Sequence, residues 1–107
     1  MTYSVEFSTG ATQDLFKIYR YIKNAGKPKT AKKFSDQIRK ACFSLSENPE
    51  RGHIPAELKG LSVMMCRQIV FNNYRIIYQV IGKVVVISGV IDGHRQIREV
   101  LRQRMLP

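Results

Sequence analysis

Three runs of residues that favour β-strands follow one another in the C-terminal half of this 107-residue chain. They span residues 66–71, 74–81 and 84–91. Two residues separate each run from the next, Asn72-Asn73 in the first turn and Gly82-Lys83 in the second, and connections of that length join antiparallel neighbours in tight hairpins. This half of the chain therefore predicts a three-strand antiparallel meander, on which the other elements must pack.

The N-terminal half predicts a strand followed by two helices. Apolar and polar residues alternate over residues 2–8, as in a half-buried strand, whereas apolar residues recur at helical spacing over residues 11–25. A break at residues 26–28, which include Gly and Pro, precedes a second helical stripe over residues 29–45. Two amphipathic helices joined by such a tight turn form an αα-hairpin.

A short basic helix is expected at the chain end, over residues 97–106, where apolar residues again recur at helical spacing. The fold class is therefore α+β in a single domain of residues 1–107: an N-terminal strand, an αα-hairpin, a three-strand meander and a short C-terminal helix. The paired helices are expected on one face of the sheet, which leaves the opposite face free.

The charge and the cysteine content limit which kinds of partner the protein can bind and in which cellular compartment it is expected. The chain carries 18 Lys and Arg against 8 Asp and Glu, a net charge of +10, which favours an acidic partner: nucleic acid, an anionic membrane surface or an acidic protein. Cys42 and Cys66 lie within apolar patterns and have neither the spacing nor the neighbours of a zinc or disulfide framework. No apolar run approaches the roughly 18 residues of a membrane span. We therefore expect a soluble protein of a reducing, intracellular compartment, without metal or cofactor.

Several motifs recur together along the chain. They are Asp14-Leu15 with Ile18, Tyr21 and Ile22; Leu45-Ser46-Glu47-Asn48-Pro49-Glu50-Arg51-Gly52; Arg67; Asn73-Tyr74-Arg75-Ile76-Ile77-Tyr78; Val90-Ile91-Asp92-Gly93-His94-Arg95; and Leu101-Arg102-Gln103-Arg104-Met105-Leu106. With these motifs at this spacing, nearly the whole chain resembles the ParE/RelE superfamily of toxins from bacterial type II toxin–antitoxin modules.

The resemblance implies one of two activities. RelE-like toxins cut mRNA on the ribosome with basic residues and often a Tyr or His near the C-terminus, whereas ParE-like toxins act on DNA gyrase without that set. Leu101 occupies the position where a RelE-like tyrosine would fall, and leucine cannot transfer a proton. The resemblance thus favours a cytoplasmic, ParE-like gyrase inhibitor, with a ribosome-dependent mRNA endonuclease as the alternative and a degenerate, antitoxin-binding member as a third possibility. An acidic cognate antitoxin is the implied partner, and the toxin–antitoxin complex would bind operator DNA through the antitoxin.

Candidate site residues follow from this reading. Target binding is assigned to Arg95, Arg98, Arg102 and Arg104, and antitoxin binding to Arg67, Arg75 and Tyr78. No catalytic residue is expected in a gyrase inhibitor; an endonuclease would use Arg67, Arg75, His94 and Arg95 to stabilise the phosphate and move protons. Structural roles stay open for several of these residues: Arg67 and Arg75 as partners of a carboxylate or of the sheet, Tyr78 as a packing residue and His94 as a turn residue that caps the last helix.

A second group of cations lies in the helical hairpin. It comprises Lys27, Lys29, Lys32, Lys33, Arg39 and Lys40. Such a run looks like a nucleic-acid patch, but more often it is a solvated helix face, and no aromatic residues are interleaved for base stacking. The arginines of the chain end are therefore preferred as the functional cluster.

Overall fold

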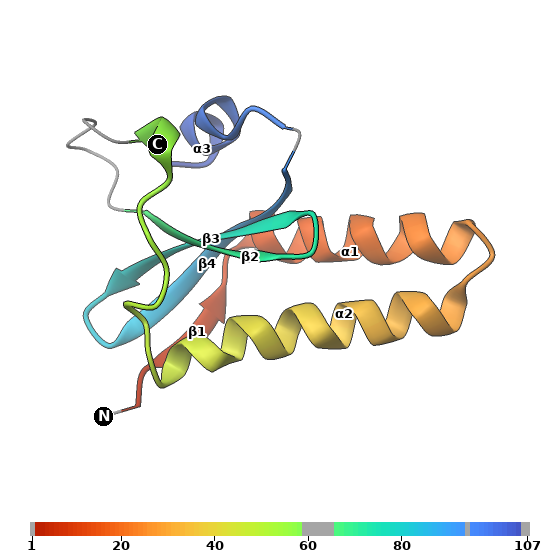
Figure 1. Cartoon of the computed structure of the whole chain (residues 1–107), viewed down its shortest axis with the longest axis horizontal. Helices are drawn as coiled ribbons and strands as arrows, with labels where there is room; N and C mark the ends of the chain where they lie inside the picture. The colour runs from red at the N-terminus through yellow and green to blue at the C-terminus, as the bar shows by residue number, and fades with distance from the viewer. Residues whose placement is uncertain (1, 59–65, 94, 106–107) are drawn as a thin grey trace.

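The structure, a computed structural model, describes residues 2–58, 66–93 and 95–105 (Figure 1). Its elements in chain order are β1 (Ser4–Phe7), α1 (Thr9–Asn24), α2 (Pro28–Phe43), the short 3-10 helices η1 (Ser44–Ser46) and η2 (Ala56–Leu58), β2 (Arg67–Phe71), β3 (Tyr74–Ile81), β4 (Val84–Asp92) and α3 (Ile97–Met105). The predicted α+β class and the predicted order of elements are confirmed.

The strands form one sheet in the order β1-β4-β3-β2. The meander β2–β3–β4 is antiparallel as predicted, and Asn72 and Gly82 in its turns have positive φ angles of 52° and 59°, the left-handed conformation that two-residue hairpins require. β1 pairs in parallel with β4. Parallel pairing requires a long connection between the two strands, and here the chain passes through the αα-hairpin, β2 and β3 before it reaches β4.

The helical hairpin covers one face of the sheet, here called the hairpin face. α1 begins after Ser8, whose Oγ accepts a hydrogen bond of 3.1 Å from the Ala11 amide and so caps the helix. Apolar residues of α1 and α2 pack with those of the strands into one core that comprises Ala11, Leu15, Ile18, Ile38, Cys42, Leu45, Ile76, Tyr78, Val85, Ile87 and Val90. Each large apolar side chain buried in this way contributes about 1.5–3 kcal/mol, which holds the hairpin on the sheet.

The opposite face of the sheet is only partly free, in contrast to the expectation from sequence. Figure 1 shows α3 and η2 together on the side of the sheet away from α2. Beneath them Ile77 and Ile91 are fully buried, whereas Val70 on the edge strand β2 and Ile81 at the far end of β3 are 62% and 60% exposed. η2 and α3 therefore cover part of the surface that two helices alone would leave open.

The described residues contain no helix that combines the length and the apolar character needed to cross a membrane. Cys42 and Cys66 are unpaired and buried, and burial raises the pKa of Cys42 to about 12. Both thiols are thus held in their neutral form, as small apolar side chains.

Candidate functional site

Arg75 on β3 is bound to side chains of its own chain. Its guanidinium makes a bidentate ion pair with Glu57 of η2, with Nη2 donating to Oε1 at 2.8 Å, and its Nε donates to Oε1 of Gln68 at 2.7 Å. The hydrogen bonds that Arg75 donates to Glu57 raise the pKa of Arg75 above its ordinary value. Of the alternatives left open for Arg75, the structure shows the pairing with a carboxylate, and this pair fixes η2 over the opposite face.

Tyr78 lies in the core and is fully buried. Its hydroxyl donates to the Pro49 carbonyl at 2.7 Å and accepts from the Gly52 amide at 2.9 Å. Burial raises the pKa of Tyr78, so the hydroxyl keeps the proton that it donates. Tyr78 therefore holds the loop that contains Pro49 and Gly52 against the sheet, while its predicted role in antitoxin binding stays a prediction.

The Tyr78→Phe variant should lose about 2 kcal/mol of unfolding free energy, because one buried amide and one buried carbonyl are left without their partner. Chemical denaturation of the purified protein measures this difference. The matched control is Tyr21→Phe, since Tyr21 is 77% exposed and its hydroxyl is in water. Equal stability of the two variants would show that the loop does not depend on the Tyr78 hydroxyl.

Arg67 on β2 supports the same loop from the next strand. Its Nη1 donates to the Gly52 carbonyl at 2.8 Å. Arg67 pairs across the sheet with Tyr78, whereas Arg75 pairs with Val70, three residues along β2 from Arg67. Because successive side chains of a strand alternate between faces, Arg67 and Arg75 project from opposite faces of the sheet. The two arginines common to the predicted antitoxin site and the alternative nuclease site are thus not brought together.

Arg104 of α3, one of the predicted target-binding arginines, is bound to residues of its own chain. Its guanidinium makes a bidentate ion pair with Asp14 of α1, at 2.6 and 2.7 Å, and donates to the Ser88 carbonyl at 3.1 Å. Asp14 is 7% exposed and also accepts from the Val90 amide at 2.9 Å. This Asp14–Arg104 clamp joins the two ends of the chain to β4.

The backbone makes room for the clamp at Gly89, which lies against the Arg104 guanidinium. A Cβ atom at Gly89 would stand 2.6 Å from Nη1 of Arg104, so a side chain at this position would displace the guanidinium. Sequence reasoning missed this role of Arg104. The available signal was Asp14, a carboxylate next to Leu15 within the apolar stripe of α1, because a charge on a buried helix face needs a partner.

The other predicted target-binding arginines lie around the start and the outer side of α3. Arg102 is exposed and makes only a loose ion pair with Glu99, 3.3 Å long, and Arg95 is exposed just before the helix. Arg98 belongs to α3, but its side chain lies outside what the structure describes, as does His94 altogether. Arg95 also lines an open groove between α1 and the ends of β3 and β4, together with Lys17, Tyr21 and Tyr74.

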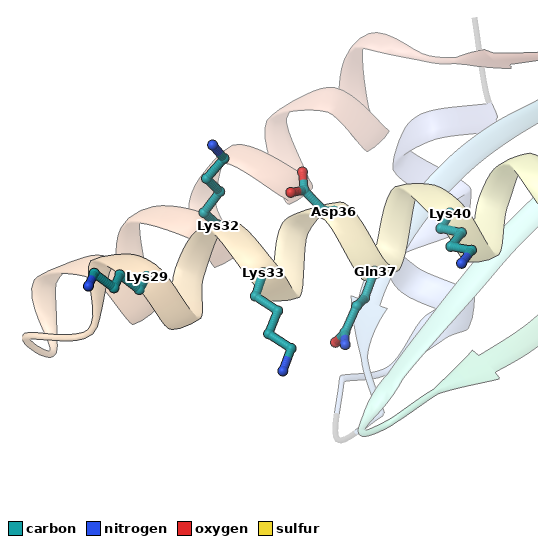
Figure 2. A pocket seen from close by; sticks show the side chains of 6 residues that line it. All are labelled: Lys29, Lys32, Lys33, Asp36, Gln37 and Lys40. Carbon is teal, nitrogen blue, oxygen red and sulfur yellow. The ribbon is translucent and has the colours of Figure 1, made fainter.

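The lysines of α2 form a separate cationic surface. Figure 2 shows Lys29, Lys32, Lys33, Asp36, Gln37 and Lys40 around an open depression on the outer side of this helix. The apolar residues of α2 face the core on the other side, so the predicted amphipathic helix is confirmed.

Comparisons with known proteins agree on one class. A family model described as the ParE toxin of the type II toxin–antitoxin system parDE matches residues 5–97. Among solved structures, a chain of the chromosomal ParDE system from P. aeruginosa is similar, with a TM-score of 0.71 and 18% identity over 85% of this chain and 96% of that one. A chain of the toxin–antitoxin complex RelBE2 from Mycobacterium tuberculosis has a TM-score of 0.62 and 23% identity, covering 86% and 99% of the two chains.

A mutant of the E. coli toxin RelE in the free state is also similar, with a TM-score of 0.64 and 22% identity, covering 98% of this chain and 96% of that one. At these identities the structural likenesses show a shared fold. No curated protein matches the sequence.

Proposed function

The chain belongs to the ParE toxin family of type II toxin–antitoxin systems, and we propose that it inhibits DNA gyrase and is held inactive by a cognate antitoxin. Gyrase inhibition by binding needs a shaped cationic surface rather than proton-transfer groups. Arg95, just before α3, and Arg102 on α3 are exposed and support such a surface, to which we also assign Arg98 of α3.

The placement of Arg67 and Arg75 is the observation that supports gyrase, rather than mRNA, as the target. Stabilising a phosphorane requires several cations that converge on one point. These two arginines lie on opposite faces of the sheet, and each guanidinium is already bound within the chain, to Gly52 or to Glu57 and Gln68. In addition, Leu101 replaces the tyrosine expected of a RelE-like nuclease.

The antitoxin is expected to be an acidic segment with apolar anchors, because the toxin carries a net charge of +10 and exposes apolar residues on part of its sheet. The exposed apolar residues Val70, on the edge strand β2, and Ile81, at the far end of β3, suit the apolar anchors of such a segment, which would order on binding and add a strand or a helix. In this proposal the complex resides in the cytoplasm and binds operator DNA through the antitoxin. Contacts confined to the outer lysines of α2 in the purified complex would contradict this placement.

The proposal predicts that the purified toxin blocks supercoiling by gyrase and leaves ribosome-bound mRNA intact when both assays are run side by side. Adding the antitoxin should restore supercoiling, which provides the control for specific inhibition. Cleavage of mRNA at toxin concentrations that leave gyrase active would overturn the assignment in favour of the endonuclease.

A histidine variant separates the two activities further. His94→Ala should leave gyrase inhibition and toxicity unchanged, whereas a general acid or base at this position would account for a loss of about 100-fold or more. Toxicity in cells and the two assays above measure this, and binding of the antitoxin confirms that the variant is folded. A 100-fold loss in a folded variant would identify His94 as part of a nuclease site.

A further inference from the structure

The outer surface of α2 carries four exposed lysines that have no role in the fold or in the proposed toxin surface. We call Lys29, Lys32, Lys33 and Lys40 the lysine face. At about 100° per residue, Lys29, Lys33 and Lys40 fall within an arc of about 40° along the helix. Figure 2 shows Lys33 and Gln37 pointing to one side of α2, and Lys32 and Asp36 to the other.

The charges of the lysine face are free to bind a partner. Within the part of the chain that the structure describes, the ion pairs involve Arg75, Arg102 and Arg104, and none involves a lysine of α2. The depression that the lysines surround contains one acid, Asp36, and one neutral polar residue, Gln37. Lys29 lies three and four residues before Lys32 and Lys33, the spacings at which like charges on a helix repel, so an anion placed among them relieves that repulsion.

We propose that the lysine face binds the phosphate backbone of duplex DNA. Lys29 and Lys40 are separated by about 16 Å along the helix axis at 1.5 Å per residue. Duplex DNA carries a phosphate of each strand about every 3.4 Å of its axis, so a face of this length is long enough to contact several phosphates of the backbone. Contacts of this kind position a protein on DNA without reading its sequence.

The chemistry of the lysine face favours duplex DNA over other acidic partners. Single-stranded nucleic acid is bound with aromatic side chains on which bases stack, whereas the depression is lined by Lys, Asp and Gln. A protein partner would need an apolar or arginine anchor, which these residues do not provide. The lysine ammonium is a compact point charge, and such charges suit contacts with the successive phosphates of a backbone.

The test measures binding of a short labelled duplex of mixed sequence to the purified toxin, by fluorescence anisotropy over a series of salt concentrations. Changing all four lysines of the face to glutamine should weaken binding at low salt by at least about tenfold, and should make the slope of log affinity against log salt shallower by about 3. The assay contains no gyrase, so its outcome is independent of the proposed inhibition.

A matched variant controls for net charge. It changes Lys17, Arg20, Lys23 and Lys83, which are also exposed, to glutamine and so removes the same number of positive charges. This control should bind DNA within about twofold of the wild type, and circular dichroism melting should show both variants folded. Equal losses in the two variants would overturn the proposal, because binding would then follow net charge alone. Tighter binding of duplex or single-stranded RNA than of DNA would also overturn it, and so would a loss of antitoxin binding with DNA binding intact.

Discussion

The Asp14→Ala variant should lose about 3 kcal/mol of unfolding free energy, because it leaves the guanidinium of Arg104 without its carboxylate in a largely buried site. For a chain of this size the melting temperature should fall by about 12 °C or more. The loss exceeds that of an ordinary ion pair, since Asp14 is 7% exposed and also binds the Val90 amide and Arg104 through two oxygens. Thermal and chemical denaturation measure the effect.

Two further variants isolate the origin of this loss. Asp14→Asn keeps an acceptor for the Val90 amide and should lose less than Asp14→Ala, and the double variant with Arg104→Ala should be little worse than either single alanine variant. Arg102→Ala is the matched control on α3, because its exposed ion pair with Glu99 contributes at most about 0.5 kcal/mol. Additive losses at Asp14 and Arg104 would contradict the clamp.

Gyrase inhibition should fall by about 100-fold or more when Arg95, Arg98 and Arg102 are changed together to glutamine, as loss of several arginines from the centre of an interface predicts. Arginine presents a rigid bidentate donor fork that suits carboxylate or phosphate. Arg104 is left in place, because its removal would test the stability of the fold rather than target binding. Supercoiling assays with increasing toxin concentration measure the change.

The variant of the lysine face provides the comparison for this experiment. Changing Lys29, Lys32, Lys33 and Lys40 to glutamine should weaken gyrase inhibition by less than about tenfold, although it removes more charge, because exposed lysines are mobile and strongly hydrated. Both variants must remain folded and bind antitoxin. If the lysine variant lost more inhibition than the arginine variant, the helical hairpin would be the surface that meets gyrase.

The elements of this protein follow from local patterns that a sequence displays directly. Two-residue turns at Asn72-Asn73 and Gly82-Lys83 leave adjacent strands no arrangement other than an antiparallel hairpin, and the apolar spacing of residues 11–25 and 29–45 fixes both the helical state and the buried side of each helix. The predicted bounds differ from the observed ones by a few residues at most, because caps such as Ser8 act within one turn.

The sequence by itself thus determined the fold class, the αα-hairpin, the meander and, through its motifs, the family. Tertiary structure alone decided that β1 pairs with β4, that α3 and η2 cover part of the opposite face, and which arginines are bound within the chain. Arg102 and Arg104 are two residues apart on one helix, yet one is exposed and the other closes a clamp on Asp14, 90 residues away. A charge is satisfied by whichever partner lies within about 4 Å in space, and that distance is set by how distant segments pack, which no local pattern records.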